Sequence, residues 1–232
     1  MSRKRSSALG QAAESHYLAR PDSETEYGVL VVHAWWGLTP FFKAFCDRLA
    51  QQGHAVLARD LYRGRTATTT EEAKRLSSRL KRDVVAEEIT RAVGDLDSAR
   101  MQAMPQACIG VVGFSLGAYW ALWLAEHKLL AVRATVAFYG SRNGDYAACQ
   151  SAFQFHLAES DDYVAESGVN KLQKALKAAG RNAEFYTYPG TTHWFTESDR
   201  AEAYNPQAAA AGLEANGPVP EMQYQVDPWI LS

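Results

Sequence analysis

The chain has few cysteines, almost no net charge and no long apolar run. Its 232 residues include three cysteines, at positions 46, 108 and 149. An odd number without the spacing of metal ligands favours free buried thiols over a disulfide framework or a metal site. The formal net charge of −2 gives no indication of nucleic acid or an anionic membrane surface as a partner.

Targeting signals are scarce as well. Residues 1–5 are basic, but residues 6–15 supply no apolar core of a signal peptide. No apolar run approaches the roughly 20 residues that a membrane span needs. Together with the reduced cysteines, this pattern predicts a cytoplasmic protein with no membrane association.

The composition fits one α/β domain, because 47% of the residues are apolar and such a chain can bury a sizeable core. We expect an N-terminal segment over residues 1–26 with an edge strand at 15–20, followed by a domain over 27–215. The tail over 216–232 includes Gly217-Pro218-Val219-Pro220, which breaks any helix. It shows no periodicity, so we assign it no structure.

Short apolar runs alternate with amphipathic stretches along the domain. The runs predict strands over 27–33, 54–59, 108–114, 134–139, 152–157 and 183–188. The amphipathic stretches predict helices over 40–52, 70–80, 83–104, 118–128 and 164–179. This alternation predicts a doubly wound, mainly parallel sheet with helices on both faces.

The sequence Gly113-Phe114-Ser115-Leu116-Gly117 links the third of these strands directly to the helix that follows. A Gly-x-Ser-x-Gly turn between strand and helix is typical of a nucleophile elbow. There the serine adopts a strained backbone, and the glycines allow strand and helix to approach closely. The N–H of Leu116, at the helix N-terminus, is then expected to donate to an oxyanion.

A serine nucleophile needs a base, and the base needs an acid that orients it. His193 follows the last predicted strand, and the order serine, acid, histidine agrees with this motif class. His33 lies just inside a strand end, where we expect a packed and hydrogen-bonded residue. Asp161 and Asp162 both follow a strand end, and the residues alone leave the choice between them open.

At this point the sequence resembles the dienelactone hydrolase family of α/β-hydrolases from about Tyr27 to Ala210. The likeness rests on motifs along the chain: His33-Ala34-Trp35-Trp36-Gly37-Leu38, Asp60-Leu61-Tyr62, Gly94-Asp95-Leu96, the elbow, Asp161-Asp162-Tyr163-Val164, Gly190-Thr191-Thr192-His193-Trp194-Phe195 and Tyr204-Asn205-Pro206. The resemblance implies an α/β-hydrolase fold, Asp161 as the acid, and the backbone N–H of Trp35 as a second oxyanion donor.

Three positions depart from the family's namesake enzymes. Those enzymes use a cysteine where this chain has Ser115, and a glutamate where it has Ala34. The arginine that they place after the catalytic histidine to bind a substrate carboxylate falls here near Glu197. A further departure is expected near the end of the domain, where the family's usual final helix is shortened or replaced after Ala210.

We therefore expect a serine hydrolase that cleaves a small ester or lactone through an acyl-enzyme on Ser115. No metal or organic cofactor is needed, and a monomer or weak homodimer is expected. Trp36, Trp194 and Phe195, beside Trp35, could wall the substrate pocket or simply pack in the core. The alternatives are a peptidase or acyltransferase with the same triad, and a non-catalytic binding module with this fold.

Overall fold

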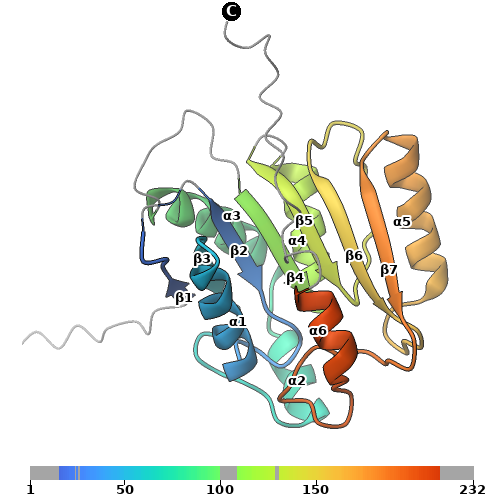
Figure 1. Cartoon of the computed structure of the whole chain (residues 1–232), viewed down its shortest axis with the longest axis horizontal. Helices are drawn as coiled ribbons and strands as arrows, with labels where there is room; N and C mark the ends of the chain where they lie inside the picture. Colours follow the sequence, from blue (N-terminus) through green and yellow to red (C-terminus); the bar gives the residue numbers. More distant parts are fainter. Residues whose placement is uncertain (1–15, 24, 26, 100–108, 129–130, 215–232) are drawn as a thin grey trace, which may run out of the picture.

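The computed structural model describes residues 16–23, 25, 27–99, 109–128 and 131–214 (Figure 1). The strands are β1 (His16–Ala19), β2 (Gly28–Val32), β3 (Ala55–Arg59), β4 (Ile109–Phe114), β5 (Val132–Phe138), β6 (Ala152–Ala158) and β7 (Ala183–Tyr188). The helices are α1 (Pro40–Gln51), α2 (Thr70–Ser77), α3 (Arg82–Ala99), α4 (Leu116–His127), α5 (Glu166–Ala178) and α6 (Pro206–Glu214). Three of the features discussed above lie outside the described residues: Cys108, the predicted end of the third helix at 104, and the tail from 215 onward.

The seven strands form one sheet in the order β1-β3-β2-β4-β5-β6-β7. Only β1 runs antiparallel to its neighbour; the other pairs are parallel. The elbow strand β4 therefore lies in the middle of the sheet, between β2 and β5. The predicted mainly parallel, single-domain α/β-hydrolase fold is confirmed.

Helices cover both faces of the sheet, as Figure 1 shows for α1 and α6 on the near face. On that face Phe42 and Phe45 of α1 and Leu213 of α6 pack in one buried cluster. On the other face, residues of α2, α3, α4 and α5 form a second cluster. Each fully buried side chain of this size stabilises the fold by about 1.5–3 kcal/mol. Two covered faces explain why all five residues of β2 are buried.

The structure shifts several predicted boundaries and adds one helix. Helix α2 ends at Ser77 instead of residue 80, and α5 begins at Glu166 instead of residue 164. Helix α4 begins at Leu116, directly after the elbow serine and two residues earlier than expected, and β5 begins at Val132 instead of residue 134. Helix α6 continues past Ala210 to Glu214. Its start carries a signal that our sequence analysis did not use: the side chain of Asn205 accepts a hydrogen bond from the N–H of Ala208 at 3.1 Å, and Pro206 occupies the first helical position.

Candidate active site

Three of the predicted site residues follow three different strands of the sheet. Ser115 comes directly after β4, Asp161 after β6 and His193 after β7. Because these strands are parallel, their carboxyl ends meet at one edge of the sheet, where ligands of such folds bind. This edge is the lower one in Figure 1.

The elbow holds Ser115 in a backbone conformation that serine rarely adopts, with φ 52° and ψ −111°. The serine N–H donates to the carbonyl of Phe138 at 3.0 Å, and its own carbonyl accepts from the N–H of Ala118 at 2.9 Å. A Cβ added at Gly117 would collide with the carbonyl groups of Val32 and His33. The close approach of α4 to the end of β2 thus requires glycine at this position, and packing maintains a strain of about 1–3 kcal/mol at the serine.

Ser115, His193 and Asp161 form a hydrogen-bonded row. The Oγ atom of Ser115 lies 2.7 Å from Nε2 of His193, and Nδ1 of the same ring lies 2.8 Å from Oδ2 of Asp161. The other oxygen of Asp161 accepts from the N–H groups of Tyr163 and Val164, at 2.9 and 3.0 Å. Asp162 is exposed and is not part of the row.

The two predicted oxyanion donors follow two neighbouring strands, β2 and β4. Leu116 is the first residue of α4, where an N–H has no partner within the helix. Trp35 lies in the loop after β2, and β2 is hydrogen-bonded to β4 up to the pair Val32 and Gly113. Among the described residues, none accepts a hydrogen bond from either backbone N–H.

Aromatic rings surround the imidazole. Trp35 stacks on Trp194 with a centroid distance of 6.5 Å, and Trp36 meets Trp194 edge-on at 5.1 Å. The ring of Tyr163, 57% exposed, lies 4.8 Å from that of His193 and 4.8 Å from that of Trp194. From the sequence, Tyr163 was noted only as part of a family motif and was given no place in the pocket, although its position two residues after the acid was a usable signal.

Phe195 occupies a different environment. Its side chain is fully buried, between the rings of Tyr139 at 5.5 Å and Tyr188 at 5.0 Å. It belongs to the cluster that packs α1 and α6 on the sheet. Because the ring has no exposed surface, we leave Phe195 out of the pocket wall and treat it as a core residue.

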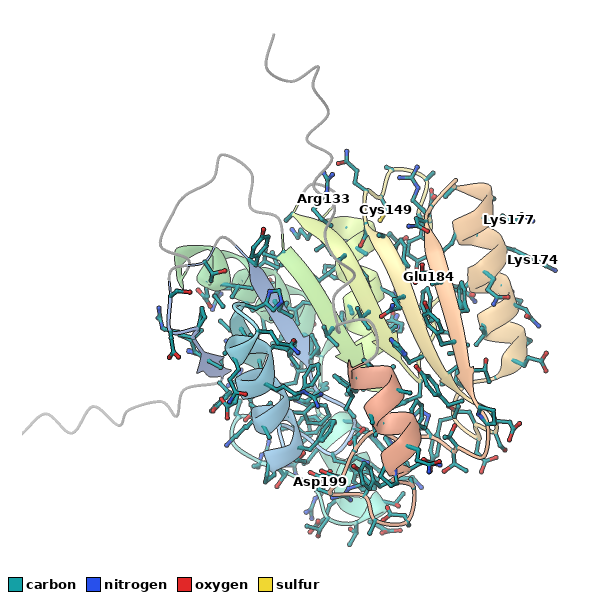
Figure 2. The ribbon with its side chains drawn as sticks, viewed as in Figure 1. Arg133, Cys149, Lys174, Lys177, Glu184 and Asp199 are labelled. Atoms are coloured by element: carbon teal, nitrogen blue, oxygen red, sulfur yellow. The ribbon has the colours of Figure 1, made fainter. Side chains whose placement is uncertain are left out.

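A buried acid lies behind His193 and was not expected from the sequence. Glu197 is fully buried, and its Oε1 accepts a hydrogen bond from the hydroxyl of Tyr139 at 2.8 Å. The ring of Tyr139 packs edge-on against that of His193 at 5.0 Å. Burial raises the pKa of Glu197 to about 8, and neighbouring Asp199 acts in the same direction. Asp199, labelled in Figure 2, lies at the lower end of the molecule.

The described part of the chain holds no group of three or more histidine, cysteine, aspartate or glutamate side chains placed to bind a metal ion. Within the same residues, no helix is both long and apolar enough to cross a membrane.

Comparison with known proteins identifies the family of this chain. The model of the dienelactone hydrolase family matches residues 15–216. The chain belongs to the dienelactone hydrolase family. Protein usf of Aquifex pyrophilus is 30% identical over 188 residues, which cover 77% of this chain and 80% of that protein. A carboxymethylenebutenolidase of Rhodococcus opacus is 26% identical over 194 residues, covering 76% and 72% of the two chains.

Solved structures show the same fold. A dienelactone hydrolase-like promiscuous phosphotriesterase from metagenomic libraries superposes with a TM-score of 0.70 at 22% identity, covering 85% of this chain and 84% of that chain. At this identity the likeness shows the α/β-hydrolase fold alone. The dienelactone hydrolase family match and the named relatives support a hydrolase of this type.

Proposed function

We propose that this chain is a serine hydrolase that cleaves a small ester or lactone through an acyl-enzyme on Ser115. The observation that carries the proposal is the row from Ser115 Oγ through His193 to Asp161, with contacts of 2.7 and 2.8 Å. A serine, an imidazole and a carboxylate in this arrangement constitute a catalytic triad.

In the proposed reaction, His193 Nε2 takes the proton of Ser115 as Oγ attacks the acyl carbon. Asp161 accepts the Nδ1–H bond, which fixes the ring's tautomer and stabilises the imidazolium that forms. The N–H groups of Leu116 and Trp35 donate to the oxyanion, with about 3 kcal/mol expected per donor. His193 then gives its proton to the leaving alcohol, and a water activated by the same ring hydrolyses the acyl-enzyme.

The surroundings of the row favour a neutral, aromatic or apolar substrate. Glu197, near the position of the family's carboxylate-binding arginine, is buried and bonded to Tyr139. Arg200 lies over the ring of Trp36 at 4.3 Å and pairs with Asp199 at 3.8 Å. Because Arg200 already has an aromatic and an anionic neighbour, we do not assign it to a substrate carboxylate. We propose that the acyl pocket is formed by four aromatic residues, Trp35, Trp36, Trp194 and Tyr163.

Substituting the nucleophile tests the proposal. Ser115→Ala should abolish hydrolysis of p-nitrophenyl acetate and reaction with a fluorophosphonate probe, with an unchanged circular dichroism spectrum. Ser167→Ala is the matched control, since Ser167 is exposed on α5. Turnover retained by Ser115→Ala would refute the assignment. Absence of probe labelling in the unmodified protein would instead favour a non-catalytic binding module.

A substrate panel tests the reaction class. We expect faster turnover of short aryl esters and uncharged lactones than of lactones that carry a carboxylate. Aminoacyl amides should be poor substrates. Preferential cleavage of the amides would favour a peptidase, and acyl transfer to an added alcohol at the expense of hydrolysis would favour an acyltransferase.

A further inference from the structure

His33 is a buried histidine outside the triad whose two ring nitrogens both have partners. The residue follows β2 directly and its side chain is fully buried. Its Nε2 accepts a hydrogen bond from the N–H of Leu61 at 3.0 Å, and its Nδ1 lies 2.6 Å from the carbonyl oxygen of Ala34. An N–H can only donate, so Nε2 carries no proton, and the proton of a neutral ring resides on Nδ1. His33 therefore donates from Nδ1 to Ala34.

The carbonyl that receives this bond belongs to the peptide group that links Ala34 to Trp35. Because a peptide group is planar, fixing its carbonyl oxygen also fixes the direction of its N–H. That N–H is the Trp35 donor of the proposed oxyanion hole. A hydrogen bond to the carbonyl oxygen also polarises the whole amide and strengthens its N–H as a donor.

Other contacts support the loop on either side of this peptide. The carbonyl of Trp35 accepts from the hydroxyl of Tyr62 at 3.0 Å, and that of Trp36 accepts from the N–H of Ala67 at 2.9 Å. These bonds hold the next two peptide groups. Apart from the N–H of Gly37 at 3.2 Å, His33 is the only described group that donates to the carbonyl of Ala34.

The ring is kept neutral by its surroundings. Burial lowers the pKa of His33. The facing acid, Asp60, lies 3.9 Å from Nε2, and its carboxylate already accepts from the N–H groups of Tyr62 and Gly64. The remaining contacts are the rings of Tyr62 at 5.1 Å and Phe42 at 6.3 Å. A second ring proton would eliminate the bond from Leu61.

We propose that His33 is a positioning residue of this hydrolase: through its Nδ1–H bond to Ala34 it aims the Trp35 N–H at the oxyanion. The inference rests on the proposed function and adds a group that touches neither the substrate nor the triad. Loss of this bond should lower kcat and transition-state affinity, because the donor acts on charge that develops in the transition state, and should leave KM nearly unchanged.

Two substitutions separate the ring's two hydrogen bonds. Asparagine places an amide nitrogen near the position of Nδ1 and can keep the bond to Ala34. Glutamine places its terminal oxygen near Nε2 and can keep the bond from Leu61 but not the one to Ala34. We expect His33→Gln to lower kcat about tenfold or more, and His33→Asn to lower it at least fivefold less. The affinity of an aryl boronic acid, which forms a tetrahedral adduct with Ser115, should follow kcat.

Equal kcat values and boronate affinities for the two variants would overturn the inference, since a role in packing alone predicts no difference between them. If Ser115→Ala retains turnover, the proposed function itself fails, whatever these variants do.

A measurement on the unmodified protein tests the same inference if the His33 variants do not fold. In ¹⁵N NMR of histidine-labelled protein, His33 should carry its proton on Nδ1 from pH 7 to 9. A proton on Nε2 or a charged ring in that range would contradict the proposal.

Discussion

The loop after β2, residues 33–37, and the segment after β7, residues 189–200, both contribute to the candidate active site, but they are held in different ways. In the loop, the carbonyls of Ala34, Trp35 and Trp36 all accept hydrogen bonds, and one buried side-chain atom, Nε1 of Trp36, has no partner among the described residues. In the segment, the buried atoms without a hydrogen-bond partner in the described chain are Nε1 of Trp194, Oε2 of Glu197, both carboxylate oxygens of Asp199 and Nε of Arg200.

The groups that hold the loop are neutral, whereas the segment contains buried groups that can ionise. Each unpaired buried polar group costs about 1–3 kcal/mol, and more if it is charged. The loop supports the proposed oxyanion donor through neutral groups, including His33, whose pKa burial lowers, and should keep its geometry at neutral and alkaline pH. In the segment, Tyr139 connects the ring of His193 to Glu197, a carboxyl group whose pKa burial raises to about 8. At neutral and alkaline pH the pH dependence of stability should therefore arise in the segment, because the lowered pKa of His33 affects the loop only at more acidic pH.

The largest effect is expected where the segment is tied to the rest of the site, at the bond between His193 and Asp161. Asp161→Asn should lower kcat by about 10³–10⁴-fold, because an amide cannot stabilise the imidazolium or hold its tautomer. Its exposed neighbour provides the control, and Asp162→Asn should remain within about twofold of the unmodified protein. Steady-state kinetics with p-nitrophenyl acetate measure both. A large loss in Asp162→Asn would show that the acid is misassigned.

The next effect concerns the support of the loop. Gly117→Ala should destabilise the fold by about 3 kcal/mol or more, because the added Cβ meets the carbonyls of Val32 and His33. Gly94→Ala, in the interior of α3 with open space around the added Cβ, should be neutral or stabilising by up to about 1 kcal/mol. Urea unfolding of the two variants compares them. Similar stabilities would mean that the close approach of α4 to β2 can relax.

Glu197→Gln tests the titratable segment. Glu197 has a pKa of about 8 in the folded state and ionises near 4.5 when unfolded, so the folded chain binds more protons between these values. The free energy of unfolding should therefore fall as pH rises from 4.5 to 8, by at most about 1.4 kcal/mol per pH unit from this group. Glutamine should remove that contribution. Urea unfolding at pH 5, 7 and 9 measures it.

Glu87→Gln, at an exposed position of α3, is the control for this slope and should leave it unchanged. If Glu197→Gln also leaves the slope unchanged, the carboxyl group titrates normally, and the contrast between the two regions is lost.

The smallest effect is expected for one of several bonds that hold the loop. Tyr62→Phe removes the donor to the carbonyl of Trp35 and should cost about 1 kcal/mol, a fall in Tm of about 2–4 °C. The kcat should change less than threefold, because the bond from His33 to Ala34 remains. Tyr204→Phe, at an exposed tyrosine, should change neither value. A larger loss of kcat in Tyr62→Phe than in His33→Gln would assign the aiming of Trp35 to the tyrosine.

The meeting of Ser115, Asp161 and His193 could be expected from the sequence, because all three follow strands whose parallel arrangement is encoded in local apolar patterns. The choice of Asp161 over Asp162 came only from the family resemblance, since adjacent aspartates differ in the direction of their side chains and not in local pattern. Glu197 could not be recognised as buried, because its burial depends on Tyr139, 58 positions away. His33 was correctly expected to be packed, but its bond to Ala34 is a matter of side-chain orientation.

The strained serine has a consequence for how the enzyme matures. The backbone of Ser115 is held by Phe138, and α4 packs against Val32, so the elbow needs strands that lie on both sides of β4 and far apart in the chain. During refolding, helices can form long before these partners arrive. Reactivity of Ser115 toward an organophosphorus reagent should then appear later than the helical circular dichroism signal. Labelling of this serine would therefore report when the sheet is complete.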